Sequence, residues 1–127
     1  MKHILIVDND AVFTTTVSSI LKKEDFDVTI ATDGKQAAEK LTGTHYDLVI
    51  TDVLIPYNNG LEIVNKVRTD ESNRHTPVMV VSNVTNEQSV SSWFKQGIDA
   101  YLKKPLDLRT LLSGIKQLVF HEKYVAA

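Results

Sequence analysis

The chain has 127 residues, which is the size of one ordinary domain. It contains no cysteine, which excludes a disulfide scaffold, a cysteine-ligated metal site and a thiol nucleophile. Its 14 Lys and Arg residues against 16 Asp and Glu residues give a net charge of -2, without the basic excess expected of a nucleic-acid-binding domain.

No stretch of the sequence is long and apolar enough to cross a membrane. The longest uninterrupted apolar runs, at 4–7 and 78–81, have four residues each, against the roughly 20 that span a bilayer. The first three residues lead directly into a short strand-like run, without the long hydrophobic core of a signal peptide. We therefore expect one cytoplasmic domain that binds neither nucleic acid nor membrane directly.

Short apolar runs alternate with amphipathic stretches along the whole chain. The short runs are rich in aliphatic and β-branched residues, as is typical of buried strands, and lie at 4–7, 28–30, 48–50, 78–81 and 100–102. Between and after them, apolar residues recur at helical spacing over 13–21, 37–41, 61–67, 90–94 and 108–119. The pattern predicts five strands and five helices in alternation.

Local signals mark the start of two of these helices. Asp107 can cap the first turn of the last helix, while Leu106 and Leu111 occupy the positions of a hydrophobic staple. Thr85 and Gln88 have the spacing of a capping box, which predicts that the fourth helix begins directly after Thr85.

The order of the elements determines the fold class. A βα unit repeated five times, with continuous apolar strands, predicts a parallel sheet covered by helices on both faces. This arrangement is a doubly wound, three-layer α/β domain. We expect a single domain over residues 1–127, with about 121–127 as a tail.

Polar residues follow most of the predicted strands. In open α/β sheets ligands bind beyond the carboxyl ends of the strands, so these residues form the candidate site. They are Asp8, Asn9 and Asp10 after the first strand, Thr51 and Asp52 after the third, Ser82 and Asn83 after the fourth, and Lys103, Lys104 and Pro105 after the fifth. Two or three carboxylates, a hydroxyl and an ammonium should therefore meet at one edge of the sheet.

This set of side chains suits phosphoryl transfer to an aspartate. Clustered carboxylates favour a hard cation such as Mg2+, and a carboxylate can also be the nucleophile that accepts a phosphoryl group. A Lys supplies a point charge for phosphate, and a Ser hydroxyl can hydrogen-bond one of its oxygens. Such transfer depends mostly on positioning and electrostatics, so these few residues are enough.

The ordered set of residues resembles the receiver domain of two-component response regulators over nearly the whole chain. Its anchors are Asp8, Asp52-Val53-Leu54-Ile55-Pro56 followed by Gly60, Ser82, and Tyr101 with Lys104-Pro105. The resemblance implies a flavodoxin-like fold, with a five-stranded parallel sheet of strand order 2-1-3-4-5 and five helices. It also implies that a sensor histidine kinase or phosphotransfer protein converts Asp52 to an aspartyl phosphate.

The resemblance also implies a role for each anchor residue. Asp8, Asp52 and the backbone carbonyl of Leu54 would hold Mg2+, while Lys104 and Ser82 would act catalytically by binding the phosphoryl group. Ser82 and Tyr101 would form the switch that relays phosphorylation to a partner surface on the fourth helix, fifth strand and fifth helix. The partner there would be a downstream effector domain or protein, or a second copy of the chain in a homodimer.

The sequence departs from the family pattern directly after the first strand. Where two adjacent acids are usual it has Asp8 and Asn9, and Asn9 keeps a carbonyl oxygen as a metal ligand but lacks the charge. Two unit charges about 4 Å apart interact by about 4 kcal/mol at an effective dielectric near 20, so the loss of even a fraction of this energy weakens Mg2+ binding by about tenfold or more. Asp10 either compensates or caps the first helix. We expect weakened metal binding.

Two functions of different classes therefore remain open. The first is a phosphorylation-operated signalling switch, which assists its own phosphorylation and dephosphorylation but is not an enzyme with an external product. The alternative is a pseudo-receiver that acts as a phosphorylation-independent protein-interaction module. Asn9 favours the alternative, and the other retained site residues oppose it. A hydrolase or flavin protein fits poorly, because no glycine-rich phosphate loop follows the first strand.

Two adjacent aromatic residues lie on the predicted fourth helix. Trp93 and Phe94 cannot both point fully inward, because neighbouring residues on a helix face different directions. We expect one of them in the core and the other at its edge, in preference to a partner surface centred on Trp93.

Overall fold

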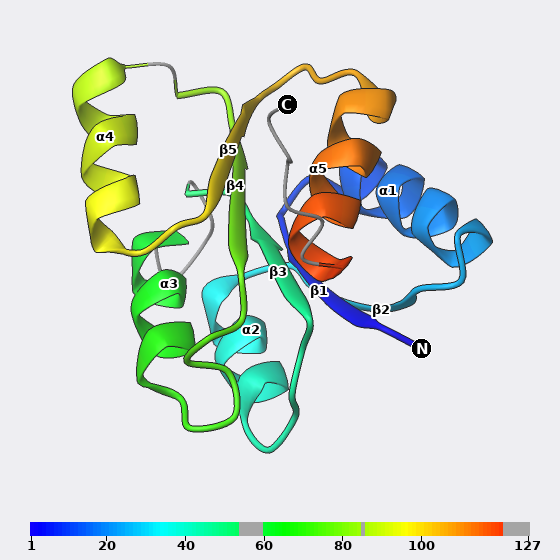
Figure 1. The fold of residues 1–127 in the computed structure, drawn as a ribbon, viewed down its shortest axis with the longest axis horizontal. Helices are drawn as coiled ribbons and strands as arrows, with labels where there is room; N and C mark the ends of the chain where they lie inside the picture. The colour runs from blue at the N-terminus through cyan, green and yellow to red at the C-terminus, as the bar shows by residue number, and fades with distance from the viewer. Residues whose placement is uncertain (54–59, 85, 121–127) are drawn as a thin grey trace, which may run out of the picture.

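A five-stranded parallel sheet runs through the middle of the domain (Figure 1). The computed structural model describes residues 1–53, 60–84 and 86–120, so Leu54, Pro56, Thr85 and the tail at 121–127 lie outside the described residues. The strands are β1 (His3–Val7), β2 (Asp27–Ala31), β3 (Leu48–Thr51), β4 (Val78–Ser82) and β5 (Ala100–Lys103), in the order β2-β1-β3-β4-β5. Both the flavodoxin-like strand order and the position of each strand, to within one residue at either end, are confirmed.

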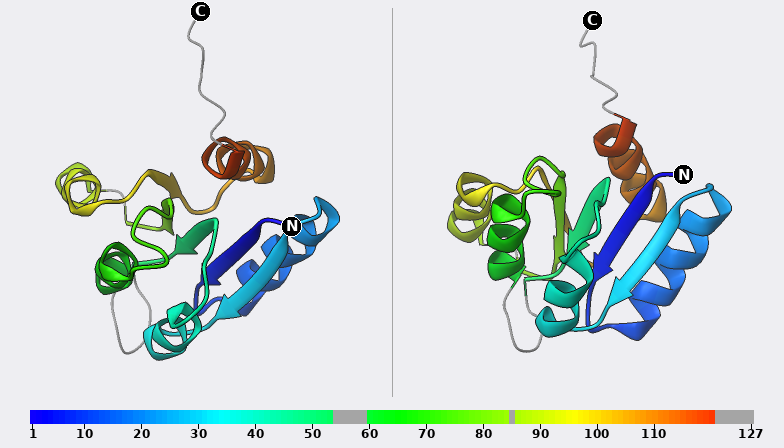
Figure 2. Two further views of the ribbon diagram at one scale, coloured as in Figure 1. Left: turned by 60° about the horizontal axis from the view of Figure 1, so that its bottom comes forward. Right: turned by 90° about the horizontal axis from the view of Figure 1, so that it is seen from below.

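Helices cover both faces of the sheet. They are α1 (Ala11–Lys23), α2 (Gly34–Leu41), α3 (Gly60–Thr69), α4 (Glu87–Gln96) and α5 (Leu108–Phe120). Figure 2 shows α1 and α5 on one face and α2, α3 and α4 on the other. The predicted three-layer α/β architecture is therefore confirmed. Among the described helices, none is long and apolar enough to cross a membrane.

The two core layers are built from alternate residues of the strands. Leu5 and Val7 pack on the side of α2, α3 and α4, whereas Ile4 and Ile6 pack on the side of α1 and α5. Successive side chains of a strand point to opposite faces, so a strand buried on both sides must be apolar at every position. This requirement explains the continuous apolar runs in the sequence.

Side-chain caps begin several of the helices that follow the strands. The Asp10 carboxylate accepts hydrogen bonds from the amides of Val12 and Phe13, at 3.0 and 3.2 Å. Asp107 caps the last helix as predicted, through the Arg109 amide at 2.9 Å. Each cap satisfies amide groups that the first turn of a helix leaves without a partner.

The predicted start of the fourth helix is wrong by one residue. Asn86 is the N-cap of α4, and its side chain accepts from the amides of Gln88 and Ser89. An Asn carbonyl is a stronger cap than a Thr hydroxyl, so the residue after Thr85 takes the position that the capping-box spacing assigned to Thr85.

Arg68 ties the ends of α3 and α4 to the sheet. Its guanidinium donates to the carbonyl of Thr76 at 2.6 Å and to the carbonyl of Gly97 at 2.7 Å. It also pairs with Asp99 at 2.9 Å, and the same carboxylate oxygen accepts from the amide of Val78 at 2.8 Å. One side chain therefore fixes two helix ends against the start of β4.

The tight contact between Arg68 and Gly97 predicts a stability difference between two glycine variants. Gly97 has a φ of 114°, and a Cβ there would lie 3.2 Å from Arg68 Nε. Gly97→Ala should lower the free energy of unfolding by about 2 kcal/mol. Gly43→Ala is the control, because Gly43 has a φ of 75° with nothing within 4 Å of an added Cβ, so its cost should be about 1 kcal/mol. Urea unfolding measures both, and equal losses would contradict the contact.

Candidate functional site

The sheet brings four of the predicted site residues together at its carboxyl edge. Asp8 follows β1, Asp52 follows β3, Ser82 ends β4 and Lys104 follows β5. Their side chains are little exposed: Asp8 is 4% exposed, Asp52 8% and Ser82 0%. The Lys104 amide donates to the Ser82 carbonyl at 2.9 Å, which holds the end of β5 beside the end of β4. Buried polar groups of this kind are costly unless they pair with one another.

The Lys104 ammonium is shared by the two carboxylates. Its Nζ lies 2.8 Å from Asp8 Oδ2 and 3.2 Å from Asp52 Oδ2. The other oxygen of Asp8 accepts from the Asp10 amide at 2.9 Å. The peptide bond between Lys104 and Pro105 is cis. The three charges, two negative and one positive, give this cluster a formal charge of one negative unit.

Burial and charge pull in opposite directions on the ionisation of this cluster. Burial raises the pKa of Asp8 above its ordinary value of 3.8, although the hydrogen bond from Lys104 opposes the shift. Burial alone would lower the pKa of Lys104, but Asp8 and Asp52 outweigh it and hold this pKa above its ordinary value. Both directions follow from one cation shared by two buried carboxylates.

The donor set suits a magnesium ion. Asp8 and Asp52 provide two hard carboxylate ligands at one point, and Mg2+ is usually held by one or two carboxylates together with waters and phosphate oxygens. Asn9 and Asp10 are exposed. The Asp10 carboxylate caps α1, so Asp10 does not replace the acid that the family usually has at the position of Asn9. Within the described part of the chain, no group of three or more His, Cys, Asp or Glu side chains forms a metal cluster.

A chain of contacts leads from Ser82 to helix α4. The Val84 amide donates to Ser82 Oγ at 3.2 Å, and the Tyr101 hydroxyl donates to the Val84 carbonyl. The Tyr101 ring packs against the Trp93 ring, with centroids 5.7 Å apart. Trp93 is buried and Phe94 is exposed, so the expectation of one core and one edge aromatic is confirmed.

Two residues make contacts at the site that the sequence did not reveal. The Phe13 ring lies under the Lys104 ammonium, 4.5 Å from Nζ, and Val84 links Ser82 to Tyr101 through its backbone. Phe13 was recognisable as a core-facing position of the first helix, but its contact with Lys104 joins distant parts of the chain. Backbone contacts such as those of Val84 leave no signal in side-chain chemistry.

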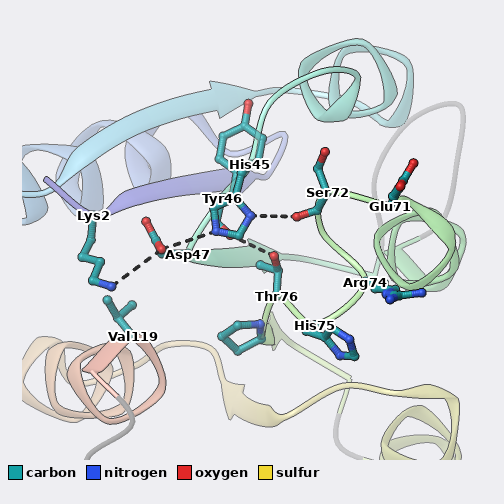
Figure 3. A pocket seen from close by; sticks show the side chains of 11 residues that line it. Lys2, His45, Tyr46, Asp47, Glu71, Ser72, Arg74, His75, Thr76 and Val119 are labelled. Atoms are coloured by element: carbon teal, nitrogen blue, oxygen red, sulfur yellow. Dashed lines mark hydrogen bonds and ion pairs between the residues drawn. The ribbon is translucent and has the colours of Figure 1, made fainter.

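A cavity lies at the edge of the sheet opposite to this cluster (Figure 3). It measures about 320 Å³ and is lined by segments that precede β1, β3 and β4, together with Val119 of α5. Several of its polar groups pair with one another: Asp47 lies 3.6 Å from His45 and 3.9 Å from Lys2, and His45 bonds the Ser72 carbonyl at 2.7 Å. None of the predicted site residues lines it, so the chemistry is assigned to the carboxyl edge.

Comparison with known proteins identifies the family. The family model of the response regulator receiver domain matches residues 4–116. The chain belongs to this family. The receiver domain is 32% identical over 119 residues to the response regulator ArlR of Staphylococcus saprophyticus, and 30% identical to ArlR of Staphylococcus aureus strain Mu50. Each match covers 94% of this chain and 53% of the relative, so the receiver domain spans about half the length of these relatives.

Solved structures share the fold of this receiver domain. The chemotaxis response regulator CheY4 of Vibrio cholerae is 28% identical with a TM-score of 0.87, and the match covers 93% of this chain and 98% of that one. The Francisella response regulator 1452 receiver domain is 26% identical with a TM-score of 0.87, and the match covers 97% of this chain and 100% of that one. A third structure is the receiver domain of the Pseudomonas aeruginosa sensor histidine kinase PA1611, which was solved with magnesium coordinated in its active site cleft. It is 23% identical with a TM-score of 0.84, and the match covers 94% of this chain and 98% of that one.

The raised pKa of Asp8 predicts that this carboxylate destabilises the receiver domain at neutral pH. Because the folded state binds the Asp8 proton more tightly than the unfolded state, stability from this group is present at low pH and is lost as the pH rises through the folded pKa. Asp8→Asn should therefore raise the free energy of unfolding at neutral pH, and the gain should shrink as the pH falls.

Urea unfolding in metal-free buffer at neutral and mildly acidic pH measures this difference. Asp10→Asn is the matched control, because Asp10 is exposed and Asn caps a helix about as well as Asp. A less stable Asp8→Asn variant at neutral pH would show that the ion pair with Lys104 outweighs the burial of Asp8.

Proposed function

We propose that this receiver domain is a phosphorylation-operated switch whose phosphoacceptor is Asp52. An oxygen of the Asp52 carboxylate attacks phosphorus while the bond from phosphorus to a histidine nitrogen of a sensor kinase or phosphotransfer protein breaks, which gives an aspartyl phosphate and the donor imidazole. The observation that carries this proposal is the Lys104 ammonium, which lies 2.8 and 3.2 Å from two buried carboxylates at the carboxyl edge of the sheet.

The surrounding residues have distinct parts in the transfer. Lys104 offsets the negative charge that the phosphoryl oxygens bring to Asp52, and the buried Ser82 hydroxyl donates to one of those oxygens. The Asp8 and Asp52 carboxylates and the Leu54 backbone carbonyl would hold Mg2+. When bound, Mg2+ supplies positive charge that stabilises the phosphoryl oxygens. The carboxylate pair and the magnesium in the PA1611 receiver support this assignment.

The contacts of Val84 provide the route by which phosphorylation is sensed. A hydroxyl of Ser82 that turns toward a phosphoryl group must change its bond to the Val84 amide, and the Val84 carbonyl is bonded by Tyr101. Tyr101 lies on β5 next to α4, so a surface of α4, β5 and α5 would present the signal. The partner would be an effector domain or protein in the cytoplasm, as the greater length of the ArlR relatives suggests. The domain would assist only its own modification.

Incubation with acetyl phosphate across a Mg2+ titration tests the phosphoacceptor. Intact-mass measurement should show the gain of one phosphoryl group that requires Mg2+, because Asp52 is the nucleophile and the ion stabilises the transferred group. Asp52→Asn, which keeps the shape of the side chain, should gain nothing.

The absence of phosphorylation would favour the alternative function. If the folded wild-type protein gains no phosphoryl group at high Mg2+, while a competent receiver reacts in parallel, the phosphorylation-independent interaction module becomes the better function. The specific observation in its favour is the neutral, exposed Asn9 beside Asp8.

Restoring the missing charge predicts tighter metal binding. Asn9→Asp should lower the Mg2+ concentration needed for half-maximal phosphorylation about tenfold, because an added carboxylate attracts the cation. Asp10→Asn should leave this concentration unchanged, since Asp10 caps α1 instead of facing the site. A midpoint that moves with Asp10→Asn and not with Asn9→Asp would assign the second metal-binding acid to Asp10.

A further inference from the structure

The Lys104 ammonium has a third neighbour besides the two carboxylates. Its Nζ lies over the ring of Phe13, 4.5 Å from the ring centroid. The face of an aromatic ring carries partial negative charge and attracts an ammonium within about 6 Å. This contact is separate from the two ion pairs, and none of the roles assigned above to the site residues accounts for it.

The start of α1 holds Phe13 in a defined place. Its amide donates to Asp10 at 3.2 Å, and the Asp10 amide donates in turn to Asp8 Oδ1 at 2.9 Å. The half-buried Phe13 ring also packs against the core layer under α1 and α5. The two hydrogen bonds hold the backbone of Phe13 near the Asp8 carboxylate, and the packing holds the ring on the side where Lys104 binds.

The ring limits where a flexible side chain can go. A lysine side chain has a long stem and a strongly hydrated head, so two carboxylates alone leave its ammonium a range of positions. With Phe13 on a further side, the Lys104 side chain is only 13% exposed. A leucine at this position would fill part of the same space, but it would offer the ammonium no attractive face.

We propose that Phe13 is a positioning residue for phosphoryl transfer, whose ring holds the Lys104 ammonium between Asp8 and Asp52 and limits its contact with water. The proposal rests on the proposed function of Asp52. It assigns no contact between Phe13 and the phosphoryl group, so the ring acts through Lys104 alone.

Phosphorylation by acetyl phosphate in matched variants tests this role. Phe13→Leu should slow the reaction about two- to fivefold, which is the range of a modest cation–π contact. Phe13→Tyr keeps the ring and should restore the wild-type rate. Phe120→Leu makes the same change at an exposed phenylalanine near the end of α5 and should also react at the wild-type rate.

A second comparison separates positioning from general damage to the fold. In a Lys104→Ala background, Phe13→Leu should cause no further slowing, because the residue through which it acts is gone. In NMR spectra, the ε-methylene protons of Lys104 should be shifted upfield by the ring in the wild type and in Phe13→Tyr, and this shift should be lost in Phe13→Leu.

The failures of the two proposals can be told apart. A wild-type protein that gains no phosphoryl group overturns the function of Asp52 and this role with it. If the wild type is phosphorylated and Phe13→Leu reacts at the same rate, the positioning role alone is overturned. It is also overturned if Phe13→Tyr is slowed as much as Phe13→Leu, or if Phe13→Leu still slows the reaction in the Lys104→Ala background.

Discussion

The sharing of one ammonium between two buried carboxylates is the interaction on which the functional edge of this domain depends. Burying a lone charge costs several kcal/mol, and Lys104 offsets this cost for both Asp8 and Asp52 because it reaches both carboxylates. The strand order makes this geometry available. β1 and β3 are neighbours, which puts their terminal carboxylates side by side, and the lysine after β5 reaches past the end of β4 to meet them.

The rest of the molecule serves as a rigid support for that cluster. The largely apolar strands are packed by α1 and α5 on one face and by α2, α3 and α4 on the other. The charged residues lie just beyond the strands, where the backbone leaves the core. Asp10 caps the start of α1 after β1, and the Arg68 guanidinium bonds the carbonyls of Thr76 and Gly97. These contacts fix the connections between the helices and the sheet. The clustered polar side chains at the ends of the strands are thereby positioned by a rigid scaffold.

The site is connected to the surface through a short series of packed groups. Val84 is the central member, because its amide contacts Ser82 and its carbonyl contacts Tyr101. Trp93 extends the series into α4, where its buried ring packs on Tyr101. A large aromatic residue at this position gives α4 a direct contact with the residue expected to sense phosphorylation.

The sequence by itself determined the class of fold and the membership of the site. Alternation of apolar runs with helical spacing placed every strand to within one residue at either end. Strands buried on both faces are continuously apolar, whereas a helix buried on one face repeats its apolar residues with a period of 3.6. The rule that polar residues gather beyond parallel strand ends was enough to bring Asp8, Asp52 and Lys104 together. The order of the strands came from the family resemblance, since periodicity does not say which strands are neighbours.

Only the tertiary structure decided the contacts between distant segments. Whether Asp10 compensates for Asn9 or caps α1 depended on where its carboxylate points, and it points to the helix amides. The one-residue shift of the α4 cap, the ring of Phe13 under Lys104 and the backbone bonds of Val84 were likewise absent from the pattern. Side-chain direction and backbone pairing are set by packing across the fold, whereas hydrophobic periodicity and motif spacing are properties of the chain alone.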